Sequence, residues 1–118
     1  MAEVLPLCRL EDIADGQARG FVVAADGGAL RLLVARRGGN VFGYRNACPH
    51  VGVPLDWTED RFMTLDGTHL LCGTHGAQFR VEDGFCVLGP CKGKSLAPLP
   101  VRVAPDGAVV LEGAVRSA

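Results

Sequence analysis

Two short motifs that combine cysteine with histidine lie in the middle of the chain. The first is Cys48–His50, with the pattern C-x-H, and the second is Cys72–His75, with the pattern C-x-x-H. Thiolates and imidazoles are the ligands that zinc and iron–sulfur clusters take. Each motif also contains a proline or a glycine, as loops do. The two motifs therefore predict a metal centre. Its ligands would be Cys48, His50, Cys72 and His75.

The order of the ligands bears on which metal is bound. Structural zinc sites usually group like ligands, as C-x(2–4)-C followed by H-x(3–5)-H. Here each motif pairs one Cys with one His, so each loop could send its Cys to one iron and its His to a second iron. A two-iron cluster in which two His replace two Cys on one iron has this ligand set. A structural zinc site in an interaction module is the alternative, and a colourless protein with stoichiometric zinc would favour it.

Short apolar segments separated by turn residues surround both motifs. The Asp-Gly and Gly-Gly turns are typical of β-hairpins, and no segment has an apolar 3.6-residue repeat over three turns. We therefore predict an all-β fold, a small sandwich or barrel, with one short helical turn at Leu10–Ile13 that Asp12 helps to cap. A first strand would contain Cys8. The other predicted strands are residues 21–25, 29–35, 41–44, 69–71, 78–81, 85–88, 101–103 and 109–111.

Size and composition indicate one soluble domain, residues 1–118. Hydrophobic residues make up 48% and charged residues 21%, and the net charge is −1. No basic stripe is visible, so we expect no nucleic-acid partner. No basic segment followed by an apolar one begins the chain, and no apolar run approaches the length of a membrane span. The expected location is the cytoplasm, where thiols stay reduced.

The residues around both motifs resemble the Rieske [2Fe–2S] family. The resemblance covers the whole chain, and most specifically residues 41–103. It rests on the segments Asn46–His50, Leu71–Phe79, Glu82–Cys86 and Gly89–Pro90. The resemblance implies the Rieske fold, in which antiparallel sheets form a base subdomain beside a small cluster-binding subdomain, here about residues 46–90.

The resemblance also implies roles for the four ligands and for a third loop. Cys48 and Cys72 would bind one iron of a single [2Fe–2S] cluster, and His50 and His75 would bind the outer iron. Gly89–Pro90 falls where the family places a loop that covers the cluster. That loop would keep water from the sulfides, while electrons would pass through the exposed imidazole edges.

Four residues depart from the pattern of the high-potential, respiratory members. Val53 and Thr74 stand where that pattern has two cysteines that form a disulfide between the ligand loops. Ala77 and Phe79 stand where it has a serine and a tyrosine whose hydroxyls donate hydrogen bonds to sulfur. Donors to sulfur stabilise the added electron and raise the potential. We therefore expect a potential toward the low end of the Rieske range, roughly −150 mV, and a titration well above zero would contradict this.

A low-potential centre suits a ferredoxin that takes electrons from a flavin-containing reductase and passes them to an oxygenase or a similar acceptor. The chain has no G-x-G-x-x-G motif and no 2-His-1-carboxylate set, because the one histidine outside the motifs is His69, a surface or strand residue. We expect an electron carrier and not an enzyme, with redox proteins as partners and no small-molecule substrate of its own. An accessory subunit or domain of a larger reductase or oxygenase complex is the alternative.

Two features allow more than one interpretation. Cys86 and Cys91 flank the Gly89–Pro90 turn as either a reversible disulfide or two reduced thiols, and the cytosol favours the thiols. Trp57 is either a docking residue for a partner or a hydrophobic plug under a long connection. If the acidic residues within 56–60 face a partner, that partner should be basic and binding should weaken with salt.

Overall fold

Ten β-strands and one 3₁₀ turn form within the part of the chain that the computed structural model describes. The described residues are 4–25, 28–47, 55, 62–64, 67–72, 76–89 and 92–112. The elements are β1 (Val4–Arg9), η1 (Leu10–Asp12), β2 (Ala18–Ala25), β3 (Gly28–Arg37), β4 (Asn40–Arg45), β5 (His69–Leu71), β6 (Gln78–Arg80), β7 (Cys86–Leu88), β8 (Pro98–Leu99), β9 (Val101–Val103) and β10 (Ala108–Glu112).

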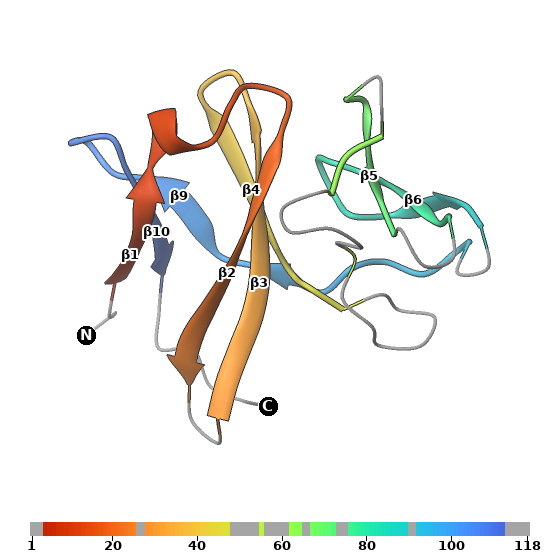
Figure 1. The fold of residues 1–118 in the computed structure, drawn as a ribbon, viewed down its shortest axis with the longest axis horizontal. Helices are drawn as coiled ribbons and strands as arrows, with labels where there is room; N and C mark the ends of the chain where they lie inside the picture. The colour runs from red at the N-terminus through yellow and green to blue at the C-terminus, as the bar shows by residue number, and fades with distance from the viewer. Residues whose placement is uncertain are drawn as a thin grey trace.

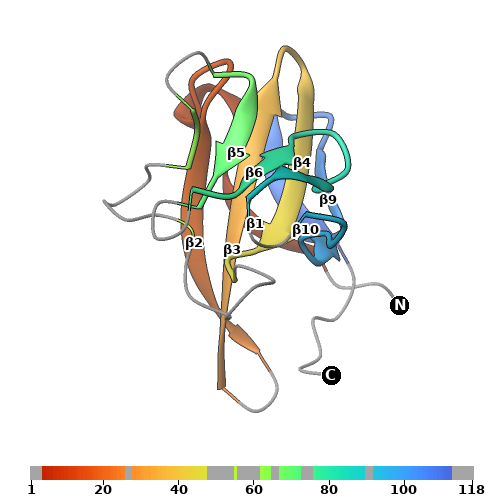
Figure 2. The same ribbon diagram turned by 90° about the vertical axis from the view of Figure 1, so that its right-hand side faces the viewer.

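The strands form three antiparallel sheets. The first sheet has the order β1-β10-β9, the second β2-β3-β4-β8 and the third β5-β6-β7. Figure 1 shows the long second sheet in the middle, with the first sheet on one side and the third on the other. Figure 2 shows the third sheet in front of the second. The all-β class and the antiparallel sheets predicted from the sequence are confirmed.

Strand β3 belongs to two hydrophobic cores because its side chains alternate between the two faces of the second sheet. Leu32 and Val34 are fully buried in a first core, which also contains Val109 of β10. Leu33 and Ala35 are fully buried in a second core, shared with the third sheet. The second core also contains Ala18, Tyr44, Leu55, Phe62, Leu70, Cys72, Ala77, Phe79, Val81, Cys86 and Leu96. The second sheet is thus packed on both faces.

The predicted helical turn is present as η1. The backbone N–H of Arg9 donates to the Asp12 carboxylate at 2.9 Å, so Asp12 caps the turn as expected. Strands β9 and β10 pair as the predicted C-terminal hairpin. No helix within the described residues is long and apolar enough to cross a membrane.

Candidate metal centre

Cys72 follows β5 and is fully buried in the second core. Its backbone N–H donates to the carbonyl of Ala77 at 2.8 Å, and the N–H of Gly76 donates to the carbonyl of Cys72 at 2.8 Å. These bonds hold together the two ends of the segment that contains His75. Several residues that the sequence singles out lie outside the described part of the chain: Cys48, His50, Val53, Trp57, Thr74, His75, Pro90 and Cys91.

The two ends of the first ligand loop are also held together. The backbone N–H of Leu55 donates to the side-chain oxygen of Asn46 at 2.7 Å, across the segment that contains Cys48 and His50. The N–H of Asn46 itself donates to the carbonyl of Arg31 at 3.0 Å, so this junction is fixed to β3. Sequence reasoning gave Asn46 no role. The only signal in the sequence was the residue type, because Asn side-chain oxygens commonly accept hydrogen bonds from backbone N–H groups at turns.

Ala77 lies opposite Cys72 on the same face of the third sheet. The β5–β6 ladder pairs Leu71 with Gln78 and Leu70 with Phe79, so the next pair in the ladder is Cys72 with Ala77. Directly opposite residues project to the same side of a sheet, with Cβ atoms about 4.5–5.5 Å apart. Ala77 and Phe79 are both fully buried with Cys72. The two positions predicted to lack hydroxyl donors therefore lie on the same face as Cys72, the one predicted ligand within the described residues.

Gly89 lies directly against the second ligand loop. A Cβ atom at this position would be 2.7 Å from the Cα of Ala77, and Gly89 has a φ of +104°. Only glycine permits both this backbone conformation and this approach. The N–H of Lys92 donates to the carbonyl of Gly89 at 3.2 Å and turns the chain back. Gly89 therefore packs against Ala77, two positions after His75 in the chain, and the cover of the cluster by a third loop stays a prediction.

Tyr44 of β4 connects the second sheet to the third. Its buried hydroxyl donates to the carbonyl of Val81 at 2.6 Å. Burial, with the nearby carboxylates of Asp83 and Glu82, raises the pKa of Tyr44 to about 12. A Cβ atom at Gly84 would be 2.7 Å from the Tyr44 ring, so the glycine lets the turn after β6 lie flat on that ring.

Arg37 at the end of β3 makes a second connection between the same two sheets. Its guanidinium lies 2.9 Å from the Glu82 carboxylate and also donates to the carbonyl of Thr68 at 2.5 Å. Within the third sheet, Arg80 pairs with Asp83, and this pairing lowers the pKa of the Asp83 carboxyl. These contacts fix the position of the third sheet, and with it Cys72, relative to the second.

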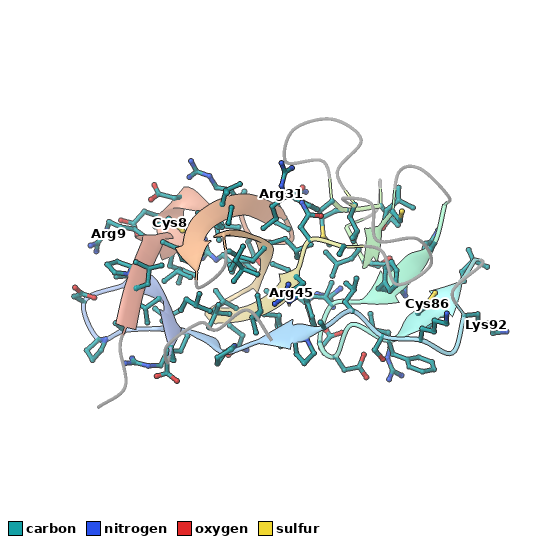
Figure 3. All side chains as sticks on the ribbon, turned by 90° about the horizontal axis from the view of Figure 1, so that it is seen from below. Cys8, Arg9, Arg31, Arg45, Cys86 and Lys92 are labelled. Carbon is teal, nitrogen blue, oxygen red and sulfur yellow. The ribbon has the colours of Figure 1, made fainter. Side chains whose placement is uncertain are left out.

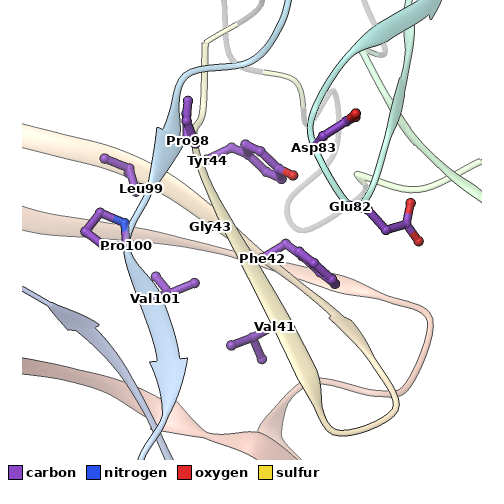
Figure 4. Close-up of a pocket in the computed structure, with 10 residues that line it drawn as sticks. All are labelled: Val41, Phe42, Gly43, Tyr44, Glu82, Asp83, Pro98, Leu99, Pro100 and Val101. Carbon is purple, nitrogen blue, oxygen red and sulfur yellow. The ribbon is translucent and has the colours of Figure 1, made fainter.

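A groove of about 200 Å³ lies between β4, the β8–β9 segment and the turn after β6. Figure 4 shows the Tyr44 ring inside it, facing the acidic residues of the turn. Its lining consists of Val41, Phe42, Gly43, Tyr44, Glu82, Asp83, Pro98, Leu99, Pro100 and Val101. Cys72, the one predicted ligand within the described residues, is not among these lining residues.

The remaining cysteine and histidine side chains in the described part of the chain have ordinary structural surroundings. Cys86 is buried in β7, and its Sγ donates to the carbonyl of Leu88 at 3.3 Å. Cys8 is a free thiol in β1, as predicted, and burial raises its pKa. His69 begins β5 and is partly buried, with Nδ1 2.8 Å from the hydroxyl of Thr68.

The donor set fits an iron–sulfur cluster. An ionised thiol is costly in apolar surroundings unless a metal compensates its charge, and Cys72 is fully buried among apolar residues. A family model described as the Rieske [2Fe-2S] domain matches residues 3–105. The chain therefore belongs to the Rieske [2Fe–2S] domain family, and its cofactor is one Rieske-type [2Fe–2S] cluster.

Solved structures support the same assignment. One chain in the complex of reduced oxygenase and oxidized ferredoxin of carbazole 1,9a-dioxygenase is 28% identical, with a TM-score of 0.73, and the match covers 98% of this chain and 97% of that one. The Sphingomonas yanoikuyae B1 ferredoxin is also 28% identical, with a TM-score of 0.68 and coverage of 92% and 97%.

A longer chain shares only the fold. The terminal oxygenase of carbazole 1,9a-dioxygenase from Nocardioides aromaticivorans IC177 is 23% identical, with a TM-score of 0.71. The match covers 98% of this chain but only 31% of the oxygenase chain. A search of curated proteins found no match.

Proposed function

We propose that this chain is a Rieske-type ferredoxin that takes single electrons from a flavin-containing reductase and passes them to an oxygenase or a similar acceptor. The observation that carries the proposal is its nearly end-to-end correspondence with a ferredoxin, set beside the family match over residues 3–105. The chain would act as a carrier between redox proteins in the cytoplasm, with no substrate of its own. The cluster-binding subdomain would span about residues 46–90.

The residues divide the work of holding the cofactor. Cys48 and Cys72 would hold one iron, and His50 and His75 the other. When bound, the cluster supplies a one-electron redox couple. The protein contributes a buried position for the Cys72 thiolate, and Gly89 lies directly against the loop that follows His75. A site that excludes water from the cluster would limit the solvent rearrangement that accompanies a change of charge.

Anaerobic purification tests the cofactor and the carrier role together. We expect about two iron and two acid-labile sulfide atoms per chain, a red-brown colour that bleaches with dithionite, and the spectroscopic signature of a two-histidine cluster. We also expect NADH to reduce the protein when a purified flavin-containing ferredoxin reductase is added, and cytochrome c to reoxidise it. A Cys72→Ser variant should lose both the colour and the electron flow. A colourless wild-type protein with stoichiometric zinc would reject the proposal in favour of a structural zinc module.

Histidine variants test the ligand assignment separately. His50→Ala and His75→Ala should fail to retain the cluster. His69→Ala is the matched control, because this histidine lies in β5 and is not a predicted ligand. It should keep the iron content and spectrum of the wild type. Loss of the cluster in His69→Ala, or its retention in His75→Ala, would show that the ligand set is wrong.

A further inference from the structure

Strand β7 and the segment that follows it present one apolar and two basic side chains to solvent. Leu88 at the end of β7 is 54% exposed, and Lys92 and Lys94 are both exposed. The N–H of Cys86 donates to the carbonyl of Lys94 at 2.8 Å. This bond folds the lysine-bearing segment back along β7, so Leu88, Lys92 and Lys94 all lie at the β7 edge of the third sheet.

This surface adjoins the second ligand loop. Leu88 pairs with Gln78 in the β6–β7 ladder, and the next residue, Gly89, touches the backbone of Ala77. Ala77 follows the predicted ligand His75 by two positions in the chain. A partner that covers Leu88 would therefore lie beside the predicted route for electrons.

The charge of this surface differs in sign from that of the whole chain, which is −1. The carboxylates of the turn after β6 are already paired, Glu82 with Arg37 and Asp83 with Arg80. Lys92 and Lys94 have no ion pair within the described residues. Figure 3 places Lys92 at the end of the molecule opposite to Arg9. The lysine charges are therefore available to a partner.

We propose that Leu88, Lys92 and Lys94 form a docking surface for a redox partner with an acidic face. The partner's carboxylates face the two lysines, and an apolar centre covers Leu88. Interfaces combine an apolar centre with a polar rim in this way, and charge complementarity sets the rate of encounter. The proposal rests on the carrier function proposed above. The alternative interpretation is that the acidic residues within 56–60 face the partner, and that surface would select a basic partner instead.

Two small redox reagents of opposite charge test the sign of this surface. The reduced protein is oxidised by ferricyanide or by hexaammineruthenium(III) at low ionic strength in a stopped-flow instrument. Reversing both charges in a Lys92→Glu, Lys94→Glu variant should lower the rate of oxidation by ferricyanide roughly 10-fold and raise the rate of oxidation by hexaammineruthenium(III). Both effects should disappear in high salt. Lys92→Glu alone should show a smaller change in the same direction.

Arg19→Glu is the matched control for Lys92→Glu. Arg19 has no ion pair within the described residues, and it interacts electrostatically with Cys8, which Figure 3 places at the end opposite to Lys92. It should leave both rates nearly unchanged. Equal effects of Arg19→Glu and Lys92→Glu would show that only net charge matters and would overturn the docking surface. So would a faster reaction of the double variant with ferricyanide.

A gold electrode coated with a mixed carboxylate- and methyl-terminated monolayer tests Leu88. The coating imitates an acidic partner with an apolar centre. Leu88→Ser should lower the electroactive coverage several-fold, whereas Val22→Ser should not. Val22 is a matched control because it is an exposed apolar residue, 65% exposed, on β2 of the second sheet. Equal coverage for Leu88→Ser and the wild type would overturn the proposal. A protein without a cluster would overturn the carrier function as well, whereas a cluster-containing protein whose variants all behave alike would overturn the docking surface alone.

Discussion

Replacing Ala77 by serine should raise the reduction potential of the cluster. Ala77 lies opposite Cys72 in the β5–β6 ladder, and both side chains are buried on the same face. With Cβ atoms about 5 Å apart, a serine hydroxyl reaches toward the Cys72 sulfur within the range of an O–H···S hydrogen bond. Reduction adds negative charge to the cluster, so the new donor stabilises the reduced state more than the oxidised state.

The size of the shift follows from the strength of such a bond. A hydrogen bond contributes about 0.5–1.5 kcal/mol, and more when its acceptor is charged. A preference of about 1.4 kcal/mol for the reduced state is a tenfold change in the equilibrium constant, which for one electron is about 59 mV. We therefore expect the potential of the Ala77→Ser variant to lie roughly 60 mV above that of the wild type.

A redox titration followed by the visible spectrum measures the shift. Ala35→Ser is the matched control, because Ala35 is fully buried in the same core but belongs to β3. It adds a hydroxyl to the core without placing it opposite Cys72, so its potential should stay within about 10 mV of the wild type. An unchanged potential in Ala77→Ser, with full cluster content, would refute the reasoning. An equal shift in Ala35→Ser would do so too, by showing that core polarity alone sets the value.

Three further substitutions test the contacts that position the centre. Tyr44→Phe leaves the buried carbonyl of Val81 without its donor and should lower the free energy of unfolding by about 1–3 kcal/mol, measured by denaturant unfolding of the holoprotein. Gly89→Ala should speed the loss of the cluster in air, because its Cβ would lie 2.7 Å from the Cα of Ala77. Gly93→Ala is the control: Gly93 also has a positive φ but lies in open space, so this variant should suffer only the backbone strain and lose its cluster at the wild-type rate. Asn46→Ala should lower the iron content after purification, because it removes the hydrogen bond from the Leu55 N–H that joins the two ends of the first ligand loop. An iron content equal to that of the wild type would show that cluster binding does not need this bond.

Local patterns predicted the strands because each strand and turn carries its own signal. The apolar run at residues 29–35 became β3, and the Pro-Asp-Gly turn became the β9–β10 connection, as turn residues favour. Strand β8, Pro98–Leu99, was not predicted. It is two residues long and begins with proline, and it forms by pairing with Gly43 and Tyr44 of β4, far away in sequence. No local period can indicate a strand that exists only through such a distant partner.

The sequence predicted the chemistry of the candidate site but not the contacts between sheets that hold it in position. The ligand types and their spacing led to the cofactor class, which the family match confirms, while the assignment of Cys48, His50, Cys72 and His75 as its ligands stays a prediction. The contacts of Tyr44 with Val81 and of Arg37 with Glu82 were not anticipated. These contacts join residues from different sheets, and nothing in the spacing of a tyrosine or an arginine along the chain indicates which distant carbonyl or carboxylate it will meet.

The structure also suggests how the ligand loops keep their shape without a disulfide between them. Val53 and Thr74 rule out that covalent link, so each loop must be closed locally. Asn46 ties the first loop to the N–H of Leu55, and paired backbone bonds join Cys72 to Gly76 and Ala77 in the second. A disulfide stabilises mainly by restricting the unfolded chain, whereas these bonds act only in the folded state. Cluster retention in this protein should therefore fall together with global stability, and reducing agents should not affect it.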